Sequence, residues 1–144
     1  MPLVYFDASA LVKLLVEEPG SELAAELWDG CDAPVASRLA YPEVCAALAA
    51  AARRQALTGD EADATARSWE EFWAATRPVE LSAAVGRHAG QLARTCALRG
   101  ADAVHLASAL AIGDPDLVVA VWDRRRHDGA RTWGLRVAPA TIDR

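Results

Sequence analysis

Two short runs of apolar residues, far apart in the chain, each end in an aspartate. Residues 3–6 are Leu-Val-Tyr-Phe and precede Asp7, and residues 117–122 are Leu-Val-Val-Ala-Val-Trp and precede Asp123. A continuous apolar run of this length, followed at once by a helical pattern, is typical of a strand buried on both faces of a parallel sheet. Open α/β sheets bind their ligands at the carboxyl ends of such strands. We therefore expect Asp7 and Asp123 at one edge of the sheet.

Helical and strand patterns alternate along the rest of the chain, without repeats or long linkers. A helical pattern follows Asp7, and apolar spacing predicts further helices over about 21–29, 41–56, 58–75, 82–98, 102–112 and 124–132. Strands are predicted over about 33–37, 77–81 and 136–137, with 77–81 at an edge because Pro78 lacks a backbone N–H. The expected fold is a single α/β domain over residues 1–144, with helices on both faces of a mostly parallel sheet.

Composition excludes several classes of protein. The chain has 144 residues, a net charge of −5 and a sequence pI near 5.1, whereas non-specific nucleic-acid binders carry a basic excess. This balance still allows a nucleic-acid enzyme whose acidic residues hold metal cations. No apolar run approaches the roughly 20 residues that span a bilayer, and the first residues lack the features of a secretory signal. The three cysteines are scattered and odd in number, so we expect no disulfide and no zinc site. Together these features predict a cytoplasmic protein without membrane contact.

Two further acidic residues are expected near the edge that holds Asp7 and Asp123. Glu43 lies in the first turn of the helix predicted from Tyr41, and Asp102 begins another predicted helix. Carboxylates that converge without partners repel one another, so a four-acid cluster implies a cation, and an all-oxygen ligand set suits Mg²⁺ or Mn²⁺. Simpler explanations also stand, because aspartate is a common helix N-cap and the helix dipole favours an acid in a first turn.

Four segments resemble, in order, the motifs of the PIN-domain ribonucleases, in particular the VapC-type toxins of type II toxin–antitoxin systems. The segments are 5–13 (Tyr-Phe-Asp-Ala-Ser-Ala-Leu-Val-Lys), Ser37 followed by Glu43, 99–107 (Arg-Gly-Ala-Asp-Ala-Val-His-Leu-Ala) and 121–125 (Val-Trp-Asp-Arg-Arg). The first and third motifs are specific, and the second is weak alone. Together they extend over essentially the whole chain at the expected length.

The resemblance implies a PIN-like fold with a five-stranded parallel sheet and an Mg²⁺- or Mn²⁺-dependent endoribonuclease that holds one or two ions. Carried over by position, Asp7, Glu43, Asp102 and Asp123 match the family's acidic quartet and would be the catalytic and metal-binding residues. Such proteins usually act on RNA as toxins, are neutralised by a VapB-like antitoxin, and are often homodimers. Many members carry a small hydroxyl residue two positions before the last aspartate, where this chain has Val121.

Three residues near these acids have two interpretations each. Ser9 is placed to cap the first helix, or, in the PIN interpretation, to hold Asp7 or touch a metal-bound water. Lys13 either faces the sheet edge that holds Asp7 or lies along the surface. Its long apolar stem favours the surface position. His105 shares a helix face with Asp102 and is either a general base or, as its apolar neighbours favour, a packed histidine.

The basic residues cluster directly after Asp123. Arg124 and Arg125, followed by Arg126 and later Arg131, belong to a polar helix. Such a run is usually a solvated helix face, but beside an acidic metal site it is also placed to contact RNA phosphates. We expect at least one of these arginines, with Arg124 and Arg125 as the first candidates, to contact RNA.

The sequence leaves two questions of function open. The helix over 58–75 carries Trp69, Phe72 and Trp73, which indicates either core packing or a groove for a partner chain. The main hypothesis is a metal-dependent endoribonuclease. The alternative is a catalytically weak PIN-fold binding module that acts through a protein partner, and Val121 is its support in the sequence.

Overall fold

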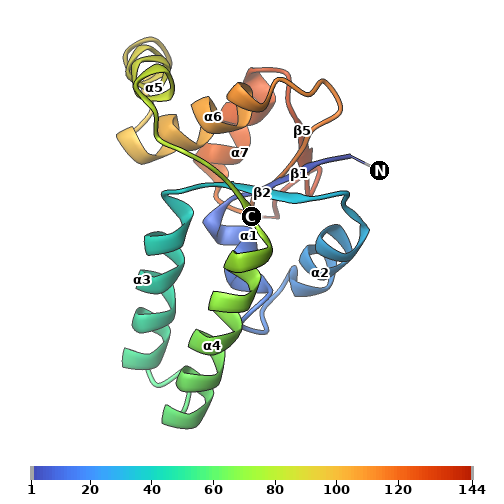
Figure 1. The fold of residues 1–144 in the computed structure, drawn as a ribbon, viewed down its shortest axis with the longest axis vertical. Helices are drawn as coiled ribbons and strands as arrows, with labels where there is room; N and C mark the ends of the chain where they lie inside the picture. Colours follow the sequence, from blue (N-terminus) through green and yellow to red (C-terminus); the bar gives the residue numbers. More distant parts are fainter. Residues whose placement is uncertain (1, 144) are drawn as a thin grey trace.

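Five parallel strands form the central sheet of the computed structural model, which describes residues 2–143 (Figure 1). The strands are β1 Val4–Phe6, β2 Pro34–Ser37, β3 Arg77–Val79, β4 Val118–Ala120 and β5 Arg136–Ala138. They lie in the order β3-β2-β1-β4-β5, and every neighbouring pair is parallel. The expected parallel sheet is confirmed, with the strand that contains Pro78 at its edge.

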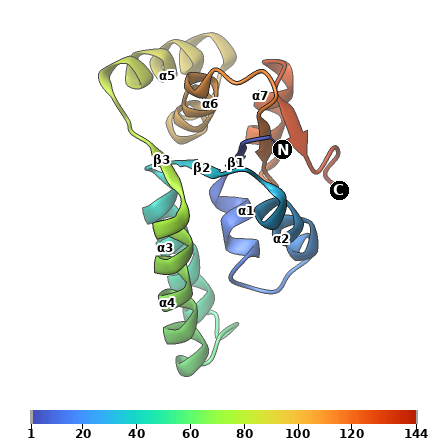
Figure 2. The same ribbon diagram turned by 45° about the vertical axis from the view of Figure 1, so that its right-hand side comes forward.

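Helices cover both faces of the sheet, α1–α4 on one side and α5–α7 on the other (Figure 2). They are α1 Ala8–Lys13, α2 Ser21–Gly30, α3 Ala40–Arg53, α4 Gly59–Ala75, α5 Ala83–Cys96, α6 Gly100–Ile112 and α7 Arg124–Thr132. The expected α/β/α arrangement is confirmed. Within residues 2–143 no helix combines the length and the apolar character needed to cross a membrane.

The central strand β1 is buried on both faces, as its apolar run predicts. Val4 and Phe6 belong to the hydrophobic core beneath α1–α4, whereas Tyr5 belongs to the core on the opposite face. Immediately after the strand, the Asp7 N–H donates to the Ala120 carbonyl at the end of β4, at 3.0 Å. The main chain therefore fixes Asp7 at the carboxyl edge of the sheet, between its two central strands.

Two predicted helix starts are confirmed. The Glu61 N–H donates to Thr58 Oγ1 at 3.1 Å and the Thr58 N–H donates to Glu61 Oε1 at 2.9 Å, which is a complete capping box at the start of α4. The Val85 N–H donates to Ser82 Oγ at 3.2 Å at the start of α5.

Helix α2 begins at Ser21, as predicted. Its N-cap is Gly20, with a left-handed φ of 96°, although serine is the more usual capping residue. A Cβ at Gly20 would lie 2.7 Å from the Trp122 indole nitrogen, so this turn needs glycine for both its conformation and its space. Ser21 instead accepts a hydrogen bond from the Glu18 N–H at 3.1 Å through its hydroxyl.

Several boundaries differ from the expected ones, and one of them affects the site. Helix α6 begins at Gly100, so Asp102 lies inside its first turn and is not its N-cap. Helix α5 ends at Cys96 because Ala97 adopts a left-handed φ of 53°. The Asp102 carboxyl group is thus free of any capping role and available for tertiary contacts.

The aromatic side chains of α4 pack inside the molecule. Trp69 is 1% exposed, and its ring lies 5.8 Å from that of Tyr41, nearly parallel to it. Phe72 lies edge-on against Trp28, with ring centroids 4.9 Å apart. Of the two interpretations of these aromatic residues, core packing is confirmed for Trp69 and Phe72.

Candidate functional site

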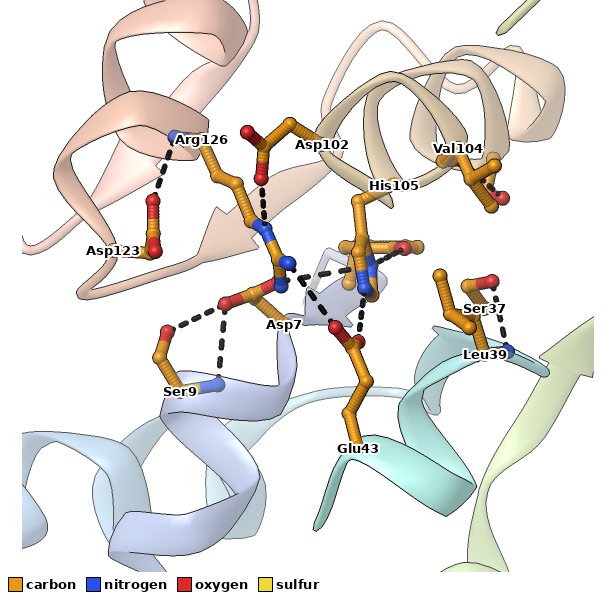
Figure 3. A network of polar contacts seen from close by, with 12 residues as sticks. Asp7, Ser9, Ser37, Leu39, Glu43, Asp102, Val104, His105, Asp123 and Arg126 are labelled. Atoms are coloured by element: carbon orange, nitrogen blue, oxygen red, sulfur yellow. Dashed lines mark hydrogen bonds and ion pairs between the residues drawn. The ribbon is translucent and has the colours of Figure 1, made fainter. Parts of the chain in front are cut away.

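At the carboxyl edge of the sheet, the guanidinium of Arg126 lies between three carboxyl groups (Figure 3). Its Nη1 donates to Asp7 Oδ1 at 2.8 Å, its Nη2 to Glu43 Oε2 at 3.0 Å, and its Nε to Asp102 Oδ1 at 2.7 Å. Asp7 follows β1, while Glu43 and Asp102 lie in the first turns of α3 and α6. We refer to the three acids Asp7, Glu43 and Asp102 as the acidic cluster.

The second oxygen of Asp7 is held by Ser9. Asp7 Oδ2 accepts hydrogen bonds from the Ser9 N–H at 3.1 Å and from the Ser9 hydroxyl at 2.6 Å. The Ser9 oxygen in turn accepts from the Trp122 N–H at 2.9 Å, which ties the start of α1 to the segment after β4. Asp7 is the N-cap of α1, so the prediction that Ser9 caps this helix is wrong. The other interpretation, that Ser9 holds Asp7, is confirmed.

A buried chain of hydrogen bonds orients Glu43. His105 Nε2 lies 2.5 Å from Glu43 Oε1, and His105 Nδ1 lies 2.7 Å from the Tyr5 hydroxyl. Because an ionised carboxylate only accepts hydrogen bonds, the proton of the contact with Glu43 lies on Nε2. His105 is 3% exposed, so it is packed as its apolar neighbours indicate, but its partners belong to the site.

The surroundings of Asp7 and Glu43 favour their ionised forms. Burial alone would raise the pKa of Asp7, but the charges of His105 and Arg126 and the hydrogen bonds from Ser9 and Arg126 hold that pKa below its usual value. Burial would also raise the pKa of Glu43, but the hydrogen bond from His105 and the charges of His105 and Arg126 lower it. Burial and the Asp7 charge raise the pKa of Tyr5 well above 10, so its hydroxyl stays protonated.

The fourth predicted acid, Asp123, lies beside the cluster. Its carboxylate accepts from the Arg126 backbone N–H at 3.1 Å and so caps α7 (Figure 3). Asp123 is exposed, whereas Asp7 and Asp102 are buried. Three of the four predicted acids therefore meet, and Asp123 fixes the first turn of the helix that carries Arg126.

Lys13 and Val121 lie outside the cluster. Lys13 Nζ donates to Glu18 Oε1 at 3.0 Å and to the Pro19 carbonyl at 2.8 Å, so this lysine holds the connection between α1 and α2. Val121 is fully buried in the apolar core on the α5–α7 side of the sheet. Both residues serve the packing of the elements that carry the acids.

A groove of about 730 Å³ opens beside Asp102, between the α5–α6 connection and α7. The exposed residues Arg99 and Arg125 line it. Arg124 instead donates through Nη2 to the Asp143 carbonyl at 2.8 Å. Of the two arginines expected to contact RNA, Arg125 is thus the one placed in the groove beside the acidic cluster.

Arg126, the centre of the site, was predicted only as one of several arginines in a polar helix. Its position three residues after Asp123 was a usable signal, because that spacing places it in the first helical turn at the same rim. Tyr5 was also missed. It is the one residue with a polar side-chain atom in the first apolar run, and it points to the face opposite Val4 and Phe6.

The chemistry of the acidic cluster fits a divalent cation. Three carboxyl groups from separate elements surround a single position that a positive group occupies, and Mg²⁺ and Mn²⁺ prefer such oxygen ligands. Among the side chains of residues 2–143, no group of three or more His, Cys, Asp or Glu residues is arranged to hold a metal ion in the present conformation. Asp7, Glu43 and Asp102 are the residues of this site whose oxygens could coordinate such an ion.

Comparisons with known proteins agree with the fold and with the order of the motifs. The chain is 72% identical over 143 residues to the ribonuclease VapC45 of Mycobacterium tuberculosis, and the match covers 99% of each chain. The crystal structure of M. tuberculosis VapC20, described as a sarcin–ricin loop cleaving toxin, superposes with a TM-score of 0.66 at 16% identity, over 97% of this chain and 99% of that one. A toxin–antitoxin complex from Klebsiella pneumoniae gives the same score, identity and coverage. At this identity the two structures show the fold alone.

The PIN domain family model matches residues 4–125, a span that begins in β1 and ends in the first turn of α7. This span contains all four acids that the motifs single out, Asp7, Glu43, Asp102 and Asp123. The match and the relative at 72% identity confirm the resemblance to the PIN-domain ribonucleases. The chain belongs to the PIN domain family.

Proposed function

We propose that this protein is an Mg²⁺- or Mn²⁺-dependent endoribonuclease and the toxin of a VapBC-like toxin–antitoxin pair. The observation that carries the proposal is the convergence of three carboxyl groups on one cationic position at the carboxyl edge of the sheet. Further support comes from the full-length relative at 72% identity, which is named a ribonuclease.

Asp7, Glu43 and Asp102 are the proposed ligands of one or two ions, with Asp123 completing the shell directly or through water. A bound ion of this kind lowers the pKa of water and stabilises the charge that develops on the leaving oxygen of a phosphodiester. The protein itself keeps its ligands ionised and fixed in orientation. Ser9 does so for Asp7 and His105 does so for Glu43, each through a hydrogen bond to one carboxylate oxygen.

RNA would approach the acidic cluster along the groove beside Asp102. Arg99 and Arg125 supply positive charge there, and contacts with phosphates position a strand without reading its sequence. Trp133 also lines the groove, with 44% of its surface exposed, and offers an aromatic face on which an unpaired base can stack. The groove therefore favours single-stranded RNA over a rigid duplex.

A VapB-like antitoxin is the proposed partner. Support comes from the K. pneumoniae structure, which is a toxin–antitoxin complex whose fold matches nearly the whole chain. The homodimer that the family resemblance implies belongs to the same proposal. Light scattering of the purified chain, with and without its antitoxin, would measure both assemblies.

The alternative function is a catalytically weak binding module that acts through a protein partner. Arg126 favours it, because the guanidinium occupies the position that a catalytic cation would need. The two functions differ in one measurable property, since a binding module has no metal-dependent activity on any RNA.

The test is cleavage of a mixed RNA pool by the purified protein with Mn²⁺, with Mg²⁺ and with EDTA. We expect cleavage with either ion and none with EDTA. Asp7→Asn keeps the capping oxygen but loses the charge, and it should slow cleavage by at least about 100-fold, because even indirect metal-site contacts are worth 10–100-fold. Circular dichroism controls for folding. Cleavage by Asp7→Asn at the wild-type rate would refute the site, and no cleavage with either ion would favour the binding module.

A further inference from the structure

Arg126 neutralises the acidic cluster from within the chain. Each of its three donor nitrogens bonds a different carboxyl group, at 2.7–3.0 Å. The Arg126 side chain is 15% exposed, and the side chains of Asp7 and Asp102 are 2% and 7% exposed. Such an arrangement is typical of a built ion-pair network and not of a surface contact.

We propose that Arg126 competes with the divalent cation for the acidic cluster and thereby determines the affinity of the site for metal. The cation binds when the guanidinium has left, and the guanidinium returns when the cation leaves. This inference rests on the metal site of the proposed function and adds to it a residue that the acidic motifs do not include.

The competition follows from which oxygens are free. Asp7 Oδ2 is held by Ser9, and Glu43 Oε1 is held by His105. The remaining oxygens, Asp7 Oδ1 and Glu43 Oε2, are the two that Arg126 binds. A cation that uses Asp7 and Glu43 in their present orientations therefore needs the same oxygens as Arg126. Both positive groups cannot occupy that position together.

Arg126 can leave the cluster without unfolding its helix. Its backbone N–H is fixed by Asp123 at the N-cap of α7, so the main chain stays in place while the long side chain rotates. The side chain lies at the rim, where part of it already reaches solvent. Departure without a replacement cation would leave Asp7 and Glu43 close together and unpaired, which is costly for partly buried charges. Arg126 thus stabilises the metal-free protein.

The size of the effect depends on how fully Arg126 occupies the cluster. Apparent affinity falls by the fraction of molecules that are competent to bind, so a cluster closed by Arg126 in about 90–99% of molecules weakens metal binding about 10–100-fold. Removal of the guanidinium should therefore strengthen the apparent affinity for metal by the same factor.

Calorimetric titration with Mn²⁺ tests the proposal on the purified full-length protein, without an activity assay. Arg126→Gln should bind Mn²⁺ at least about tenfold more tightly than wild type. In EDTA the same variant should unfold at a lower temperature than wild type, and Mn²⁺ should raise its unfolding temperature by more. Arg131→Gln removes an equal charge from the exposed last turn of α7, and it should match wild type in both measurements.

Equal or weaker Mn²⁺ binding by Arg126→Gln, with binding by wild type intact, would overturn the competition and leave the proposed metal site standing. Absence of Mn²⁺ binding in both proteins would instead refute the metal site of the proposed function. If Arg126→Gln does not fold in EDTA, the same titration uses Arg126→Lys, whose single ammonium cannot bond three carboxyl groups as a guanidinium does. Tighter binding by Arg126→Lys than by wild type would support the competition, and equal or weaker binding would overturn it.

Discussion

Removal of the Ser9 hydroxyl tests how firmly Asp7 is held. In Ser9→Ala, Asp7 Oδ2 loses the hydrogen bond of 2.6 Å, and the Trp122 N–H loses its acceptor at 2.9 Å. A hydrogen bond to a charged group contributes about 1.5–3 kcal/mol, and a buried donor left without a partner costs about 1–3 kcal/mol. The Ser9 N–H still bonds Asp7, and Ser9 is only partly buried, so we expect a total loss of about 2–4 kcal/mol in the free energy of unfolding.

Urea unfolding of the metal-free protein measures this loss, with Ser82→Ala as the matched control. Ser82 Oγ accepts one hydrogen bond from the Val85 N–H at a helix start, and removal of such a cap costs about 1 kcal/mol. Ser9→Ala should therefore lower the free energy of unfolding by at least about 1 kcal/mol more than Ser82→Ala. If both variants lose the same free energy of unfolding, Ser9 contributes no more than a helix cap and does not fix Asp7.

Three further outcomes follow from the site and the core. In the folded protein the pKa values of Asp7 and Glu43 lie below their usual values of 3.8 and 4.5. The two carboxylates therefore contribute fully to stability above the usual values, and this contribution is lost as the pH falls through the lowered folded-state pKa values. Urea unfolding between about pH 6 and pH 2 should show the loss of stability, with a smaller pH dependence in Asp7→Asn. Trp69→Ala removes a fully buried ring and should cost about 3–5 kcal/mol in the same assay, and a loss below about 1 kcal/mol would contradict the packing of α4. On the Asp7→Asn background, Arg125→Gln should weaken binding of single-stranded RNA and lower the slope of log affinity against log salt by about 0.7, whereas an unchanged slope would exclude a phosphate contact.

The convergence of Asp7, Glu43 and Asp102 was predictable because it depends on the course of the main chain. Two apolar runs that each end in an aspartate indicate parallel strands, and parallel strands bring their carboxyl ends to one edge. Helix α3 follows β2 and begins at the same edge, which places Glu43 of its first turn nearby, whereas Asp102 is brought there by α6, which follows α5 and not a strand. The positions of the strands and the approximate starts of the helices follow from local sequence patterns, so the sequence suffices for them.

The partners of individual side chains were harder to predict, because they depend on distances across the fold. Asp123 and Arg126 both follow β4, and the sequence favoured Asp123 for the site, since its type and place match the acidic motif. In the structure the Asp123 carboxylate turns to the start of its own helix, and the side chain one turn later reaches the cluster. Ser9 illustrates the same limit, because a serine near a helix start bonds whichever group lies closest, and here Asp7 has taken the cap.

The central claim is that Asp7, Glu43 and Asp102 form a site for a divalent cation that Arg126 fills in the absence of metal. The most direct measurement is a crystal structure of the protein grown with Mn²⁺, with anomalous diffraction data collected at the manganese absorption edge. We expect an anomalous peak between the three carboxyl groups, with the Arg126 guanidinium withdrawn from them. An Arg126 side chain that still bonds all three carboxyl groups, with manganese elsewhere or absent, would contradict the claim.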